Sequence, residues 1–148
     1  TSAKSSVWIS MALARALNFL VALGQGTSGQ NPTITLEQAD DAAGTNAREL
    51  KIKRVSHKLG GPAINAANDV WVENPLLIDT PASSFQVTGG DTKELVVNVY
   101  VLTQDLDDTG KFVRLKVDDF GAAARKGVVL AIPSGVNTLG KRSESFLE

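Results

Sequence analysis

Three acidic stretches hold the side chains best suited to metal binding or acid–base chemistry. The first covers residues 105–110, starts at Asp105, ends at Gly110 and begins like a calcium-binding loop. An EF-hand loop also needs a bidentate glutamate at its last position, where this chain has Lys116. We therefore predict a polar turn, with a loose calcium contact shared with another loop as the alternative.

The other two stretches are pairs of neighbouring carboxylates, Asp40 with Asp41 and Asp118 with Asp119. Such pairs can serve acid–base or metal chemistry. Each pair lies where a predicted strand ends and a loop begins, and aspartate at such positions commonly accepts hydrogen bonds from the turn backbone. We therefore predict that both pairs stabilise turns.

The chain offers little for nucleophilic catalysis. It has no cysteine, His57 is its only histidine, and no serine lies in a G-x-S-x-G elbow. Lys51, Lys53 and Arg54 would suit a phosphate group, but alternating lysines on the water-facing side of a strand explain them without a ligand. Aromatic residues for stacking on bases are missing. The sequence therefore predicts a protein that is not an enzyme, with no catalytic or metal-ligating residue, no cofactor and no nucleic-acid partner.

A glycine-rich segment over residues 24–29 matches G-x-G-x-x-G. A dinucleotide site requires a helix to begin there, so that the helix N-terminus meets the pyrophosphate. Instead, Pro32 and a run typical of a strand follow. We therefore predict that this segment is a hairpin loop.

Length and composition indicate one domain with a sizeable core. The chain has 148 residues, a formal net charge of -1 and 43% hydrophobic residues. Acidic and basic residues are interspersed, which argues against a general polyanion binder. No apolar run is long enough to span a bilayer, so we expect no membrane partner.

Alternation of apolar and polar residues predicts a series of short strands. In residues 33–39, Ile34 and Leu36 point one way while the residues between them point the other. Gly44 lies at the centre of the polar loop over residues 40–47, which indicates a turn into the next strand. Further strands are predicted over residues 18–23, 49–55, 84–88, 94–102, 112–118 and 127–132, with weaker ones over residues 7–11 and 70–78.

Three expectations concern less regular parts of the chain. Residues 12–17 are expected to form a helical turn, with a single helix over residues 10–23 as the competing interpretation, because alanine and leucine favour helices. Residues 56–68 are expected to be an irregular connection. The strand over residues 127–132 is expected to be buried, because it is apolar throughout.

These elements predict an all-β, mainly antiparallel fold, either a β-sandwich or a jelly-roll-like barrel with extended N- and C-terminal arms. We expect an N-terminal arm over residues 1–13, a β-sandwich domain over residues 14–133 and an extended C-terminal tail over residues 134–148. The apolar pair Phe146 and Leu147 would anchor this tail on a neighbouring subunit.

Several segments resemble a family of small structural proteins encoded in gene clusters of tailed bacteriophages and prophages. The resemblance rests on the apolar strand over residues 17–24, the TITLEQADDAAGTNAREL block over residues 33–50, the GKFVRLKV segment over residues 110–117 and the closing strand over residues 128–132. Residues 56–83 do not match that pattern.

The resemblance implies a virion component without catalytic activity, with a capsid decoration or cement protein as the favoured role. Such a protein would bind the head shell and stabilise contacts between capsomers. Its partners would be the major capsid protein of the same virion and further copies of itself, expected as a homotrimer. It would be made in the host cytoplasm and reside on the capsid surface. The alternatives are a head–tail connector or tail-tube subunit, and a carbohydrate-binding β-sandwich module of a tail or fibre.

Apolar residues near the ends and in the weakest strand are the expected partner contacts. These residues are Val7, Trp8, Trp71, Phe146 and Leu147. A carbohydrate-binding module would instead need exposed aromatic residues over a polar groove, and only Trp8, Trp71 and Tyr100 are available for that role.

Overall fold

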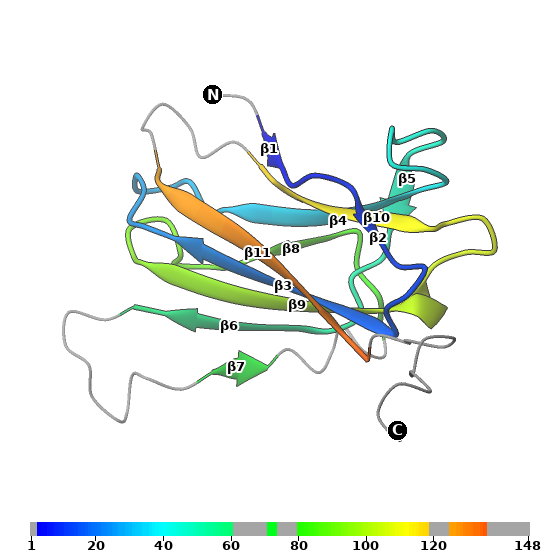
Figure 1. Ribbon diagram of the computed structural model, residues 1–148. Coiled ribbons are helices and arrows are strands. Elements are labelled where there is room, and N and C mark those ends of the chain that lie inside the picture. Colours follow the sequence, from blue (N-terminus) through cyan, green and yellow to red (C-terminus); the bar gives the residue numbers. More distant parts are fainter. Residues whose placement is uncertain (1–2, 61–70, 74–79, 119–124, 136–148) are drawn as a thin grey trace, which may run out of the picture.

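The protein folds as a sandwich of two antiparallel β-sheets (Figure 1). The computed structural model describes residues 3–60, 71–73, 80–118 and 125–135. The only helix in these ranges is the 3-10 helix η1 at Thr103–Asp105. The described residues thus contain no helix that is long and apolar enough to cross a membrane. The predicted all-β sandwich is confirmed, and its two sheets are open rather than closed into a barrel.

One sheet has six strands, with β4 and β10 at its centre. Its strands are β1 (Lys4–Ser5), β2 (Ile9–Ser10), β4 (Thr33–Ala39), β5 (Arg48–Leu50), β8 (Ser84–Gln86) and β10 (Phe112–Val117). β4 pairs with β10 on one side and with β5 and β8 on the other. β1 and β2 pair with the remaining side of β10. The strand predicted over residues 33–39 is therefore central to this sheet.

The other sheet has five strands and ends in a long edge strand. In spatial order its strands are β11 (Gly127–Ser134), β3 (Ala16–Leu23), β9 (Leu95–Leu102), β6 (Val55–Leu59) and β7 (Val72–Glu73). Figure 1 shows β11 in orange alongside β3 in blue. The prediction that residues 127–132 are buried is wrong, because only one face and one edge of β11 are covered by described residues.

The core lies between the sheets and takes every second side chain of the long strands. The fully buried side chains from the central strands are Leu17, Phe19, Val21, Ile34, Val97, Val99, Val113 and Leu115. Full burial of one such side chain stabilises the fold by about 1.5–3 kcal/mol. Because strand side chains alternate, the residues between these positions point away from the core and form two outer faces.

The N-terminal segment is extended, as expected, but it lies along its own sheet. β1 pairs with Val117 and Lys116 of β10, and β2 pairs with the opposite end of that strand. Between them, the Ser6 N–H donates to the Leu115 carbonyl at 2.9 Å. Met11 then enters the core and is buried there. The segment thereby covers the β10 edge of the six-stranded sheet.

The single strand predicted over residues 49–55 is wrong, because the chain changes sheets within it. β5 ends at Leu50 in the six-stranded sheet, and β6 begins at Val55 in the five-stranded sheet. Leu50, Ile52 and Val55 are all buried, since both sheets face the same core. The buried positions therefore keep a period of two from Leu50 to Ile52 and shift by one residue before Val55. β6 also occupies the start of the connection predicted to be irregular over residues 56–68.

Two further expectations about secondary structure need correction. Residues 12–17 form no helical turn and residues 10–23 form no helix, because β3 begins at Ala16 and pairs along its length with β9 and β11. This pairing overrides the helix preference of alanine and leucine. Of the strand predicted over residues 70–78, β7 is seen at Val72–Glu73, and residues 74–79 lie outside the described part.

The glycine-rich segment over residues 24–29 is a loop, as predicted, and no helix follows it. It connects β3 to β4, which belong to different sheets, so it is not a hairpin loop. Gly29 adopts φ 83°, a conformation that glycine tolerates best, and its N–H donates to the Asp91 carboxylate at 2.7 Å. The loop therefore has a structural role between the sheets.

Candidate functional site

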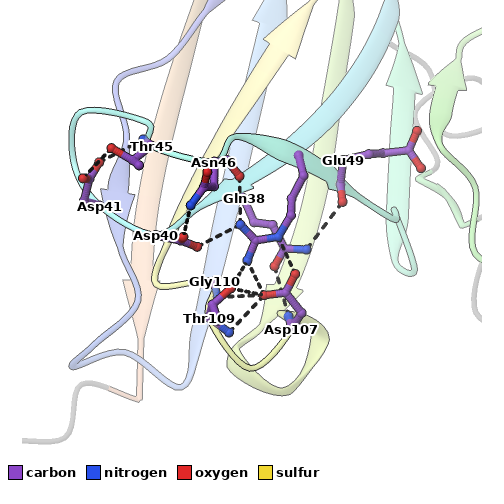
Figure 2. Close-up of polar contacts among 10 residues, drawn as sticks. Gln38, Asp40, Asp41, Thr45, Asn46, Glu49, Asp107, Thr109 and Gly110 are labelled. Atoms are coloured by element: carbon purple, nitrogen blue, oxygen red, sulfur yellow. Dashed lines mark hydrogen bonds and ion pairs between the residues drawn. The ribbon is translucent and has the colours of Figure 1, made fainter.

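The loop that carries Asp40 and the loop that carries Asp107 lie side by side (Figure 2), and Arg48 of β5 hydrogen-bonds to both. The Arg48 guanidinium donates to Asp40 Oδ1 at 2.8 Å and to Asp107 Oδ2 at 2.5 Å. It also donates to Asp107 Oδ1, and to Thr109 Oγ1 at 2.5 Å. Two-point pairing of arginine with a carboxylate fixes the relative orientation of the two groups. Arg48 thereby joins the loop over residues 40–47 to the loop that contains Asp107.

Both of these acidic loops are turns, as predicted. Asp41 Oδ1 accepts from the backbone N–H of Thr45 at 3.0 Å, and Asp107 Oδ1 accepts from that of Gly110 at 2.7 Å. Hydrogen bonds from Thr45 lower the pKa of the Asp41 carboxyl, and those from Arg48 lower the pKa of the Asp107 carboxyl. Both carboxylates are therefore ionised hydrogen-bond acceptors, which is the opposite of what a general acid at neutral pH requires.

Asp105 forms a second cluster where the chain crosses between the sheets. Its carboxylate is 4% exposed and lies 3.1 Å from Lys53 Nζ and 2.7 Å from Arg54 Nη1. It also accepts from the Leu102 N–H at 2.8 Å. Burial raises the pKa of Asp105, but the hydrogen bonds outweigh burial and leave the pKa below its ordinary value. The cluster joins the crossover between β5 and β6 to the end of β9.

The described residues form no metal centre. Nowhere in these ranges do three or more histidine or carboxylate side chains gather around a common point. Asp105 and Asp107 belong to the same proposed calcium stretch, but they bind the cations of two different clusters. After β10, the Asp118 N–H donates to the Thr33 carbonyl at 2.8 Å, and Asp119 lies outside the described residues.

Calcium is therefore expected to leave the melting temperature unchanged. Arg48, Lys53 and Arg54 already neutralise the carboxylates, so a calcium ion would have to displace these side chains. Thermal unfolding followed by circular dichroism, in excess calcium chloride and in sodium chloride of equal ionic strength, checks this expectation. A calcium-specific rise in melting temperature would instead support the calcium-loop alternative at residues 105–110.

His57 is not part of a nucleophile–base pair within the described residues. It lies half-buried in β6, with its ring centroid 5.7 Å from that of Phe85. Its Nδ1 atom is buried and has no hydrogen-bond partner in the described part of the chain. Burial lowers the pKa of His57 from its ordinary value of 6.5. His57 is therefore a neutral packing residue at neutral pH.

Trp8, an expected partner contact, is largely engaged within its own chain. The Arg114 guanidinium carbon lies 4.4 Å from the centroid of a Trp8 ring, in a cation–π contact. The indole also packs against Gly44, where an added Cβ would lie 2.5 Å from Trp8 Nε1. Gly44 has φ 84°, so this close approach and the backbone conformation both favour glycine. Trp8 thereby fastens the N-terminal segment to the loop over residues 40–47.

The other expected contact residues are not brought together into one surface. Val7 and Trp71 are 75% and 44% exposed, and Phe146 and Leu147 lie outside the described residues. Tyr100 points outward from β9 in the five-stranded sheet, whereas Trp8 lies over β10 in the six-stranded sheet. The described residues therefore do not gather an aromatic platform of the kind that the carbohydrate-binding alternative requires.

The outer face of the six-stranded sheet is polar. Glu37 on β4 accepts from Arg114 Nε at 2.6 Å and from Lys116 Nζ at 3.1 Å, both on β10. On the same side, Lys51 Nζ lies 2.5 Å from Glu49 Oε1 and donates to Ser83 Oγ at 2.5 Å. A face covered by such pairs is suited to contact with water.

Part of the outer face of the five-stranded sheet is apolar, chiefly along β11, while Asn18 of β3 and Asn98 of β9 lie on the same side. On β11, Val128, Leu130 and Ile132 are 51%, 50% and 49% exposed. The register places Leu130 beside Leu20 of β3, and Val128 beside Ala22, which in turn pairs with Val96 of β9. Directly paired residues share a face. We call the set made by Leu20, Ala22, Val96, Val128, Leu130 and Ile132 the apolar outer face.

No match was found when the chain was compared with protein families, with curated proteins and with solved structures.

The apolar outer face was not among the contact residues expected from the sequence, because its β11 part was predicted to be buried. The sequence did show that residues 127–132 form an apolar strand without charged residues. Strand periodicity does not show, however, whether such a strand is covered on one face or on both.

Proposed function

We propose that the chain is a non-enzymatic structural component of a tailed-phage virion, a capsid decoration or cement protein that binds the head shell through its apolar outer face. The contrast between the two sheets carries the proposal: one outer face is covered by ion pairs, while the other presents half-exposed valine, leucine and isoleucine. Contiguous exposed apolar residues on a small domain mark sites of interaction.

Two further observations support a structural role. The acidic loops that are best suited to chemistry are held by Arg48, Lys53 and Arg54, and they stabilise turns and the crossover between the sheets. The resemblance to structural proteins of tailed phages supplies the class of partner, the major capsid protein of the same virion. The virion capsid surface as location and the homotrimer both stay predictions.

Binding to head shells assembled without this chain tests the proposal. The purified chain is expected to pellet with shells built from the major capsid protein of the same virion. Leu20→Lys should weaken binding at least roughly tenfold, because it would bury a charge in an apolar contact. Thr33→Lys is the matched control, since Thr33 is half-buried and faces outward from a central strand of the polar sheet.

Circular dichroism melts should show that both lysine variants fold before their binding is compared. Failure of the wild-type chain to pellet with shells would argue against a decoration role. Equal pelleting of wild type and Leu20→Lys would argue against the apolar outer face as the contact. A ring of six or more subunits in solution would favour the connector or tail-tube alternative.

A further inference from the structure

The outward edge of β11 is open in the described part of the chain. β11 pairs with β3 over all eight of its residues, and no described residue hydrogen-bonds to its other edge. The Gly24 N–H donates to the Lys126 carbonyl at 2.8 Å. This pair continues the β3–β11 register by one residue, because Gly127 lies opposite Leu23. Hydrogen-bonded pairs alternate in an antiparallel ladder, so the even-numbered residues of β11 bond to β3. The backbone groups of Gly127, Val129 and Ala131 therefore face outward.

This edge lacks most of the features that normally prevent strand pairing. Edge strands are usually short or carry charged residues, bulges or prolines. β11 has eight residues, none of them charged, and its one proline is Pro133, near its end. The other long edge, that of β10, is covered by the N-terminal segment. Among the described strands, β11 is therefore the longest open edge to which another strand can add.

We propose that β11 pairs antiparallel with β11 of a second copy, about a two-fold axis at Leu130. This register sets the outward-facing Val129 opposite Ala131 of the second copy, so each donates its N–H to the carbonyl of the other. Gly127 then donates to the Pro133 carbonyl of the second copy. The missing N–H of Pro133 falls at the end of the ladder, where its loss costs least.

The side chains and charges fit this arrangement. Val128 comes to lie opposite Ile132 of the second copy, and Leu130 opposite its own counterpart, so the apolar outer face continues across both copies. Lys126 is exposed just before β11, and antiparallel pairing keeps the two lysines at opposite ends. Parallel pairing would bring them side by side. A self-complementary strand of this kind is what a two-fold interface requires, which favours a second copy over a foreign strand.

The inference goes beyond shell binding and does not depend on it, because the pairing needs only this chain. Light scattering of the purified wild-type chain should therefore give twice the chain mass of 15.6 kDa, a dimer in place of the homotrimer that the phage resemblance implies. The chain has no cysteine, so a single introduced cysteine reports the register. Leu130→Cys places two thiols on strands whose Cα atoms are about 4.5 Å apart, which a disulfide can bridge.

Val128→Cys is the matched control on the same face, because its two thiols would be offset by four residues, or about 13 Å. Under mild oxidation, Leu130→Cys is expected to give a covalent dimer and Val128→Cys is expected to stay uncrosslinked. A circular dichroism melt confirms that each variant is folded. A wild-type monomer or trimer would overturn the proposal, as would a Leu130→Cys variant that does not crosslink. Equal crosslinking of the two variants would overturn this register.

Discussion

Phe19→Ala is expected to lower the free energy of unfolding by about 3–5 kcal/mol. Phe19 is fully buried in β3 and is among the largest side chains of the core, so its removal leaves a cavity between the two sheets. The neighbouring residue of the same strand, Leu20, points to the opposite face. Urea unfolding monitored by circular dichroism, at concentrations where the chain is monomeric, measures the change.

Leu130→Ala provides the comparison for this prediction. Leu130 is 50% exposed on the outer face of the same sheet, so its truncation should cost about 1 kcal/mol or less in the monomer. The ratio of the two effects tests whether the sheet has one buried and one open face. A loss at Leu130 as large as that at Phe19 would mean that part of the chain itself covers the outer face, which would then not be available to a partner.

Asp105→Ala is expected to lower the free energy of unfolding by about 2–4 kcal/mol. The carboxylate is 4% exposed, and its loss leaves Lys53, Arg54 and the Leu102 N–H without their shared acceptor. The partial exposure of both cations places the expected effect below that of a fully buried pair. Chemical unfolding of the variant and the wild type measures the difference.

Asp108→Ala is the matched control, because Asp108 lies on the same loop and is exposed. We expect it to change stability by about 0.5 kcal/mol or less. The pKa of Asp105 is lower in the folded chain than its ordinary value of 3.8, so its contribution is present above that value and disappears as the pH falls through the folded-state pKa. Asp105→Ala should therefore lose less stability than wild type on acidification. Equal losses from Asp105→Ala and Asp108→Ala would show that the Asp105 cluster does not hold the crossover.

Much of the fold could be predicted from local patterns. The strand over residues 33–39 and the apolar alternation of residues 94–102 correspond to β4 and β9, because each strand packs one face on the core. The passage from β5 to β6 could not be predicted in the same way. Both sheets bury side chains toward one core, so the alternation of Leu50 and Ile52 looks like a single strand.

In the candidate site, too, local contacts could be predicted from the sequence and long-range contacts could not. The turn held by Asp41 and the polar turn over residues 105–110 were correctly predicted, because those hydrogen bonds are local. The ion pair of Arg48 with Asp107 joins residues 59 positions apart, and no local pattern indicates it. The exposure of β11 depends on the number of packed layers in the fold, and the alternation of residues along a strand does not reveal that number. Trp8 was expected on a partner, but it packs on Arg114 and Gly44 of its own chain.

The central claim is that the chain assembles through its five-stranded sheet, at β11 and the adjoining apolar outer face. Amide hydrogen exchange of the peptide that contains β11, measured over a dilution series and again with head shells, tests this claim most directly. At high concentration the outward amides of Gly127, Val129 and Ala131 should exchange at least roughly tenfold more slowly than in the dilute chain, while the peptide that contains β4 should not change. Exchange of β11 at one rate under all these conditions would contradict the claim.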